Sequence, residues 1–298
     1  MKEKKLTLKS SKKVAIVYRL HSPESVKLAK QITTKLKAKR YKVYTAPEQK
    51  ELPQAELLVS SNNLKDMSLV IVLGGDGTYL RAVRLLKGHQ VPILGFNMGS
   101  LGFLTAHTSD EVFATIDSTI KNNMVVQQRS RIHAMVKTKS GKKLSFDALN
   151  DIVIERGSFS QLISTSVFFE KSLVSHIKAD GLIISSPTGS TAYNLAAGGP
   201  ILHPETDAFV VTPVAPHSLT TRPFIFPDNK KLTLKLDMEG NLAHLIVDGQ
   251  KVLDLSNEDE VTLSKSLVPH LMVRKPNHDF FQLLKDKLKF GDRNATRN

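Results

Sequence analysis

A buried-strand pattern that runs directly into a glycine-rich turn constrains this chain more than any other feature. Residues 69–78 read LVIVLGGDGT, so three glycines surround the single carboxylate of Asp76. A continuous apolar run of this kind is typical of a strand covered on both faces, and open α/β sheets bind ligands at the carboxyl ends of such strands. Because glycine lets backbone N–H groups approach a phosphate closely, the segment indicates phosphoryl chemistry, with Asp76 able to bind a metal ion or accept a proton.

Strands and helices alternate through the first 125 residues. Strands are expected at 13–19, 41–44, 68–73 and 91–96, and helices at 23–39, 78–87 and 109–122. Ser22 is a candidate N-cap of the first helix, with Pro23 at its first position. Ser109 is the corresponding candidate for the third helix, with Asp110 and Glu111 in its first turn. This alternation predicts βαβ units around a mostly parallel sheet.

Short β-rich runs replace this pattern from about residue 125 to residue 269. Examples of these expected strands are 132–138, 143–147, 151–155, 164–169, 181–185, 231–236 and 244–247, with one helical interruption at about 190–197. Asp248-Gly249 between two apolar runs is a strong hairpin signal. The second part is therefore predicted to be an antiparallel sandwich, followed by an amphipathic helix at 279–288 and a disordered tail at 291–298.

The net charge of +14 is concentrated in residues 1–13, 27–42 and 274–298, and the rest of the chain is close to neutral. A solvated basic face and charged chain ends account for this distribution, and no aromatic platform or DNA-binding motif accompanies it. No apolar run approaches the about 18 residues that span a bilayer. The absence of cysteine fits a cytoplasmic location. We therefore expect neither a nucleic-acid nor a membrane partner.

Two further segments place polar groups at the ends of predicted strands. Asn150 and Asp151 open an apolar strand, where they suit ribose hydroxyls or a base edge, or else form an Asx turn. Residues 180–200 read DGLIISSPTGSTAYNLAAGGP, and four hydroxyl side chains precede the predicted helix there: those of Ser186, Thr188, Ser190 and Thr191. Since an N-cap needs one hydroxyl, this crowding indicates an anion site at the helix N-terminus.

The glycine motifs also have structural interpretations. The GGDGT turn can be a tight strand-to-helix connection capped by Asp76 or Thr78, since neither G-x-x-x-x-G-K-[ST] nor G-x-G-x-x-G after a strand is present. Gly95, Gly99 and Gly102 indicate a backbone that passes close to another group, or a plain loop.

These motifs, in this order and spacing, resemble the NAD kinase family. GGDG alone is shared with diacylglycerol and sphingoid lipid kinases and with phosphofructokinases, whereas the long block at 180–201 is specific. The resemblance covers residues 14–269. It implies a Rossmann-like α/β domain at 1–125, completed by a C-terminal helix at 270–298, and a β-sandwich-like dinucleotide-binding domain at 126–269. It also implies transfer of the ATP γ-phosphoryl group to the adenosine ribose 2′-hydroxyl of NAD, a divalent cation (Mg²⁺), and a homodimer or homotetramer.

The same resemblance assigns roles to residues. Asp76 would accept the proton of the 2′-hydroxyl, with Gly75 and Gly77 contacting the same dinucleotide. Asn150 and Asp151 would hold its ribose and base, although many relatives carry Glu at the position of Asp151. Further contacts are expected from Gln161, Lys178, Asp180, Thr191, Ala192, Tyr193, Asn194, Leu195, Ala196, Ala215 and Gln250. Some relatives carry arginine at the position of Lys178, so the sequence leaves the choice between NAD and NADH open.

Two other functions are compatible with parts of the sequence. A lipid kinase of the same superfamily would favour a membrane-docking apolar surface and lack the TGSTAY segment at 188–193. A non-catalytic dinucleotide sensor, or a nucleic-acid-binding protein, would use the basic segments without turning over ATP. The TGSTAY segment and the near-neutral middle of the chain favour the NAD kinase interpretation.

Overall fold

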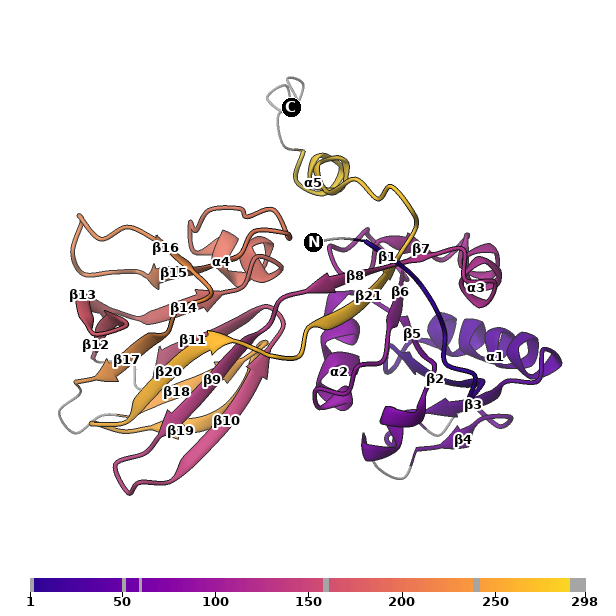
Figure 1. Ribbon diagram of the computed structural model, residues 1–298, viewed down its shortest axis with the longest axis horizontal. Coiled ribbons are helices and arrows are strands. Elements are labelled where there is room, and N and C mark those ends of the chain that lie inside the picture. The colour runs from indigo at the N-terminus through magenta and orange to yellow at the C-terminus, as the bar shows by residue number, and fades with distance from the viewer. Residues whose placement is uncertain (1–2, 50–51, 59–60, 158–160, 238–241, 290–298) are drawn as a thin grey trace. The chain divides into compact units, whose positions relative to one another are not determined.

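The computed structural model describes residues 3–49, 52–58, 61–157, 161–237 and 242–289 (Figure 1). The chain forms two compact units: Met1–Gln128 together with His270–Asn298, and Arg129–Pro269. The tail predicted to be disordered at 291–298 lies outside the described residues.

A nine-stranded sheet forms the frame of the first unit (Figure 1). Its parallel part has the order β21 (His270–Arg274), β6 (Ile93–Asn97), β5 (Leu69–Leu73), β2 (Lys13–Tyr18), β3 (Lys42–Thr45) and β4 (Glu56–Leu57). β1 (Lys4–Lys5) and β8 (Val125–Arg129) pair antiparallel, and β7 (His107–Thr108) pairs with β6. Every residue of β5 is buried, as the continuous apolar run predicts.

The described part of the first unit contains four α-helices, and the first begins where the sequence predicts. They are α1 (Pro23–Ala38), α2 (Asp76–Leu86), α3 (Val112–Ile120) and α5 (Phe280–Leu288), with a short 3₁₀ helix at Ser61–Asp66. Ser22 caps α1, because its side chain accepts a hydrogen bond from the Ser25 N–H at 3.3 Å. Ile32 and Leu36 of α1 belong to the core cluster that includes Ile71 of β5. None of the described helices is long and apolar enough to cross a bilayer.

The start of α3 differs from the prediction. The helix begins at Val112, three residues after Ser109, and no side chain caps it. The reason is that the Glu111 side chain contacts residues that precede it in the chain. Its carboxylate accepts a hydrogen bond from the Thr108 N–H at 3.3 Å and contacts His107 Nδ1 at 3.2 Å. Glu111 also pairs with Lys275. The acids at 110 and 111 therefore stabilise the preceding turn instead of the first turn of a helix.

The second unit is the predicted antiparallel sandwich, built from two six-stranded sheets (Figure 1). The first sheet has the order β10 (Lys143–Ala148), β9 (Ile132–Lys137), β20 (Glu260–Lys265), β17 (Leu232–Leu236), β12 (Ile163–Phe169) and β13 (Ser172–Ala179). The second has the order β16 (Phe224–Pro227), β15 (Ala208–Val214), β14 (Gly181–Ser185), β11 (Asp151–Arg156), β18 (Ala243–Val247) and β19 (Gln250–Leu255). One core cluster takes Val136 and Leu234 from the first sheet and Ile154 and Phe209 from the second.

We predict that Ser22→Ala destabilises the protein and that Ser109→Ala does not. Loss of an N-cap acceptor costs about 0.5–2 kcal/mol, whereas Ser109 is exposed and precedes α3 without capping it. Thermal unfolding followed by circular dichroism measures both variants. Equal melting temperatures for the two would contradict the assignment of Ser22 as the cap.

Candidate functional site

Asp76 is the first residue of α2 and follows the glycine turn at the carboxyl end of β5. Gly75 occupies the N-cap position, and no side chain caps the helix. The structural alternative in which Asp76 or Thr78 caps α2 is therefore wrong. Helix α2 also begins two residues earlier than predicted, which fixes the backbone of Asp76 in the first helical turn.

The carboxylate of Asp76 is held by the loop at residues 102–105. Oδ1 accepts from the N–H groups of Leu104 and Thr105, both at 3.1 Å, and from the Thr105 hydroxyl at 3.0 Å. Oδ2 accepts from the Phe103 N–H at 2.9 Å. Consecutive backbone N–H groups of this kind form a concave anion site. Oδ1 thus has three donors and Oδ2 one, which leaves Oδ2 with acceptor capacity for another group.

Gly102 shows why this loop contains glycine. A Cβ atom at Gly102 would lie less than 3.0 Å from Asp76 Oδ1 and from Thr105 Oγ1, and one at Gly95 would meet the Tyr79 ring in the same way. The prediction of a close backbone approach is therefore confirmed for these two glycines. The nearest atom to a Cβ at Gly99 would be 3.8 Å away, so the alternative of a plain loop holds there.

Arg274, at the end of β21, supports the same loop from its other side. Its side chain is fully buried, and its guanidinium donates to the carbonyl oxygens of Phe103 and Leu104 at 2.9 and 3.1 Å. Asn97 adds a hydrogen bond from Nδ2 to Thr105 Oγ1 at 2.9 Å. Sequence reasoning missed Arg274, because 170 residues separate it from Leu104 and no local motif marks it.

In the second unit, Asp248 holds the turn that carries Asn150 and Asp151. Its carboxylate accepts from three consecutive N–H groups, those of Leu149 at 2.9 Å, Asn150 at 2.7 Å and Asp151 at 3.2 Å. Asp248 and Gly249 both have positive φ, 46° and 75°, as the predicted hairpin turn between β18 and β19 requires. The turn was predicted from the sequence, but the second role of the Asp248 side chain was not.

The 150–151 turn is held from its other side by the segment that follows β14. Ser186 donates from its hydroxyl to the Leu149 carbonyl at 2.6 Å and from its N–H to the Asn150 carbonyl at 2.8 Å. Gly189 packs so closely that a Cβ there would overlap the Asn150 carbonyl oxygen. Within this turn and the segment that holds it, two buried side-chain oxygens lack a hydrogen-bond partner among the described residues: Asn150 Oδ1 and Thr188 Oγ1.

The predicted anion site at a helix N-terminus is wrong for three of its four hydroxyls. They donate to backbone carbonyls within the unit: Ser186 to Leu149, Ser190 to Pro187 at 2.7 Å, and Thr191 to Thr188 at 3.4 Å. The helical segment is split into a 3₁₀ turn, Gly189–Thr191, and a single turn α4, Tyr193–Ala196. These hydroxyls therefore shape the turn, and Thr188 Oγ1 is the one hydroxyl of the four without a hydrogen-bond partner among the described residues.

Asp151 and Asp248 are two buried carboxyl groups in one place. Burial, and secondarily the charge of Asp248, raises the pKa of Asp151 to about 7. Burial also raises the pKa of Asp248, but its three backbone N–H donors and Arg131 favour its charged form. The three N–H donors make Asp248 the member of the pair that is better suited to hold the negative charge, and Asp151 exchanges its proton near neutral pH.

The other predicted site residues of the second unit form two groups along β11 and β14. Asp151 pairs with Ser185 and Glu155 with Gly181, so the two ends are four residues apart, or about 13 Å. Asn150, Asp151 and Gln250 lie at the first end, and Gln161, Lys178, Asp180 and Ala215 at the second.

Helix α4 packs on β14, the strand that runs between these two groups. Tyr193 is 41% exposed, and burial followed by the charges of Glu155, Asp151 and Asp180 raises its pKa. Thr191, Ala192, Leu195 and Ala196 are at least partly accessible. Asn194 is fully buried, and its amide binds the Ser190 and Pro200 carbonyls and the Thr212 hydroxyl. Its side chain therefore supports the segment from inside.

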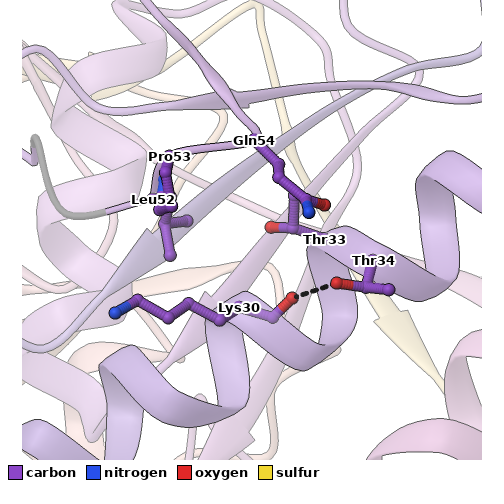
Figure 2. A pocket seen from close by; sticks show the side chains of 6 residues that line it. All are labelled: Lys30, Thr33, Thr34, Leu52, Pro53 and Gln54. Carbon is purple, nitrogen blue, oxygen red and sulfur yellow. Dashed lines mark hydrogen bonds between the residues drawn. The ribbon is translucent and has the colours of Figure 1, made fainter.

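A cavity of about 160 Å³ lies in the first unit between α1 and the segment at 52–54 (Figure 2), and Asp76 does not line it. It is lined by Lys30, Thr33, Thr34, Leu52, Pro53 and Gln54, none of them a predicted site residue. The described residues contain no group of three or more His, Asp or Glu side chains that could hold a metal ion by themselves.

Two family models match the chain: the ATP-NAD kinase N-terminal domain over residues 14–124 and the ATP-NAD kinase C-terminal domain over residues 149–275. The NAD kinase of Bdellovibrio bacteriovorus is 55% identical over 98% of this chain and 97% of its own length. The NAD kinase of Syntrophobacter fumaroxidans is 34% identical over 93% of this chain and 98% of its own.

Solved structures agree with these matches. The crystal structure of yeast NADH kinase complexed with NADH has a TM-score of 0.87 and 26% identity, and the match covers 94% of this chain and 88% of that one. An NAD kinase from Archaeoglobus fulgidus in complex with ATP has a TM-score of 0.71 and 25% identity, with 93% and 96% covered.

We predict that Asp151→Asn stabilises the ligand-free protein above neutral pH. The pKa of Asp151 rises from 3.8 to about 7 on folding, so the folded state is penalised as pH rises through this range and carries the full penalty above pH 7. The gain should be absent near pH 4 and on the order of 1–4 kcal/mol at pH 8, measured by urea unfolding at each pH. A gain that does not change with pH would contradict this.

Asp248→Asn is the matched variant and has the opposite expected sign. It replaces an acceptor of three backbone N–H groups by an amide with only one acceptor atom. At least one buried N–H loses its partner, which costs about 1–3 kcal/mol. Both substitutions replace a carboxylate by an amide at neighbouring positions. Opposite changes in the free energy of unfolding at pH 8 would therefore distinguish the destabilising charge of Asp151 from the stabilising hydrogen bonds of Asp248.

Proposed function

Because this chain belongs to the NAD kinase family, we propose that it carries out the family's reaction with the groups described above. It transfers the γ-phosphoryl group of ATP to the 2′-hydroxyl of the adenosine ribose of NAD and forms NADP and ADP. In this reaction Asp76 accepts the proton of the hydroxyl. Gly75 and Gly77 border the reacting groups, and the second unit binds the dinucleotide.

The observation that supports this role most directly is the way Asp76 is held. Its carboxylate has four donors, three of them backbone N–H groups, yet Oδ2 accepts only one. A rigid carboxylate with one oxygen open is suited to orient an alcohol and take its proton. A ribose hydroxyl is a poor nucleophile, so its orientation contributes much of the catalysis in phosphoryl transfer.

The proposed transfer of the phosphoryl group makes one bond, breaks one bond and moves one proton. The 2′-oxygen forms a bond to the γ-phosphorus as the bond to the β,γ-bridging oxygen breaks, and the proton passes to Asp76 Oδ2. The Thr78 N–H donates to the Gly75 carbonyl at 3.0 Å. The N–H groups of Asp76 and Gly77 come before this first hydrogen bond of α2, and N–H groups at a helix start favour the phosphate charge. Gly75 and Gly77 have open space where a Cβ would stand, so the phosphates can approach this backbone closely.

The dinucleotide would extend along β14 between the two groups of residues in the second unit. Asn150 Oδ1 and Thr188 Oγ1 are buried without hydrogen-bond partners among the described residues and are the groups best placed to meet its donors. Asp151 contributes a carboxyl group beside them, and the half-exposed Tyr193 offers a ring for stacking. Lys178 and Asp180 would flank the nicotinamide end.

Mg²⁺ would enter bound to ATP, because the described side chains do not form a metal site of their own and Mg²⁺ commonly binds substrate phosphates with few protein ligands. We further infer a cytoplasmic homodimer or homotetramer. In support, β16 lies at an edge of its sheet and exposes Ile225, which is 54% accessible. Light scattering of the purified protein measures the assembly, and a monomer would overturn this inference.

Incubation with Mg-ATP and either NAD or NADH, with the product identified by mass, tests the reaction itself. A product heavier by one phosphoryl group from NAD supports the proposal, and the ratio of the two rates measures the preference between NAD and NADH. Phosphorylation of a diacylglycerol with none of NAD would contradict it.

We predict that Asp76→Asn lowers the rate of NADP formation by about 10²–10⁴-fold, the range for loss of a general base, while the protein stays folded. The rate is measured in an assay coupled to an NADP-dependent dehydrogenase, and folding by circular dichroism. Asp117→Asn removes a surface carboxylate of the same unit that pairs with Lys35 and Lys39, so it serves as the control with unchanged turnover. Unchanged turnover in Asp76→Asn itself would refute the role of Asp76.

A further inference from the structure

We propose that Arg274 is a positioning residue for this reaction, which holds the Asp76 carboxylate through two peptide groups of the 102–105 loop. The inference rests on the role of Asp76 proposed above. It assigns to a buried arginine at the end of β21 a task in catalysis that it performs without touching a substrate.

The two peptide groups are each bound at both ends. In the peptide between Phe103 and Leu104, the carbonyl accepts from Arg274 Nη2 at 2.9 Å and the N–H donates to Asp76 Oδ1 at 3.1 Å. In the next peptide, the Leu104 carbonyl accepts from Arg274 Nη1 at 3.1 Å and the Thr105 N–H donates to the same Oδ1 at 3.1 Å. Both peptide dipoles therefore point from a cation to an anion, the orientation in which each hydrogen bond strengthens the next.

Arg274 is fully buried, so its charge must be compensated by groups of the protein and not by water. Its side chain has no exposed surface, and no carboxylate of a described residue lies within 4.0 Å to form a direct ion pair. Burial lowers the pKa of Arg274, while Tyr79 and then the charge of Asp76 favour its protonated form. A buried charge needs compensation, and Asp76 contributes to it through the two intervening peptides.

The neighbouring histidine leaves Arg274 as the cation of this cluster. Burial, and then the charge of Arg274, lowers the pKa of His107 to about 4, so His107 is neutral near pH 7. Glu111 and Lys275 pair with each other on the exposed side of His107. His107 therefore does not share the cationic role of Arg274 in the parent chain near pH 7.

The planar guanidinium is the group that fits this task. It places two parallel N–H donors on two successive carbonyls, a fork that a lysine ammonium cannot reproduce. Without it, both carbonyls lose a donor and the loop is free to shift, and the N–H groups that orient Asp76 move with it. A displacement of about 1 Å at a reacting group can lower a rate by about 10²-fold.

A double-mutant cycle tests the proposal with four proteins: the parent chain, Arg274→Met, Asp76→Asn and the double variant. We expect Arg274→Met to lower kcat by about 10–100-fold with KM for NAD and ATP within about threefold, because the dinucleotide groups of the second unit are untouched. We expect the double variant to be no slower than Asp76→Asn alone. Lys275→Met, at the adjacent exposed position, is the control with unchanged kcat.

The outcomes separate this inference from the function on which it rests. If Asp76→Asn is slow but Arg274→Met is as fast as the parent chain, or if the two losses multiply in the double variant, Arg274 does not act through Asp76 and the inference is overturned while the proposed function stands. If Asp76→Asn retains full turnover, the role of Asp76 fails and the inference fails with it.

Arg274→Lys keeps the test decisive if Arg274→Met does not fold. It retains the buried charge and one donor, so we expect an intermediate loss of kcat that again disappears in the Asp76→Asn background. A loss of the same size in both backgrounds would show a general structural defect and overturn the inference.

Discussion

The arrangement of this protein depends on one interaction that occurs twice: a carboxylate that accepts hydrogen bonds from three consecutive backbone N–H groups. Asp76 binds those of residues 103–105, and Asp248 binds those of residues 149–151. Buried N–H groups must find partners, and charge-assisted bonds are about twice as strong as neutral ones. A single side chain thereby fixes an otherwise irregular loop at the end of a strand. In the first case the loop presents the carboxylate, and in the second the carboxylate presents Asn150 and Asp151.

The second of these sites is held in place by hydrogen bonds, yet it contains two buried carboxyl groups that repel each other when both are charged. Asp151 lies buried beside Asp248, and Asn150 Oδ1 is buried without a partner among the described residues. Neither feature stabilises the ligand-free fold, since a buried charge and an unsatisfied acceptor both cost free energy. Such costs are typical of binding sites, where the ligand supplies the missing partner. The hydrogen bonds of Asp248 and Ser186 keep the turn in place against them.

Much of the fold could be predicted because its signals are local. The apolar run of β5, the cap at Ser22 and the Asp248-Gly249 hairpin each depend on a few adjacent residues. Strand β13 was missed because most of its residues are not buried, so its alternation is weak. Strand β15 is a mostly apolar segment that contains Pro213, and a proline within such a segment argues against a central strand.

The candidate site was predicted only where a motif carried it. Asp76, Asn150 and Asp151 lie in recognisable segments, whereas Arg274 and Asp248 act on loops 170 and about 98 residues away. The hydroxyls near residue 188 were misread for the same reason. Their backbone partners, such as the Leu149 carbonyl, are set by tertiary contacts that the local sequence does not show.

The position of β21 has a consequence for how the chain folds. This strand joins the parallel sheet beside β6, pairing Met272 with Ile93, but it is made only after the whole sandwich at 129–269. During synthesis on the ribosome, β7 can already pair with Phe96 and Asn97 of β6, but the Ile93 end of this edge stays without its β21 partner, and an unpaired edge is prone to wrong pairing. The sandwich has all of its strands before that edge is closed, so we infer that it matures first.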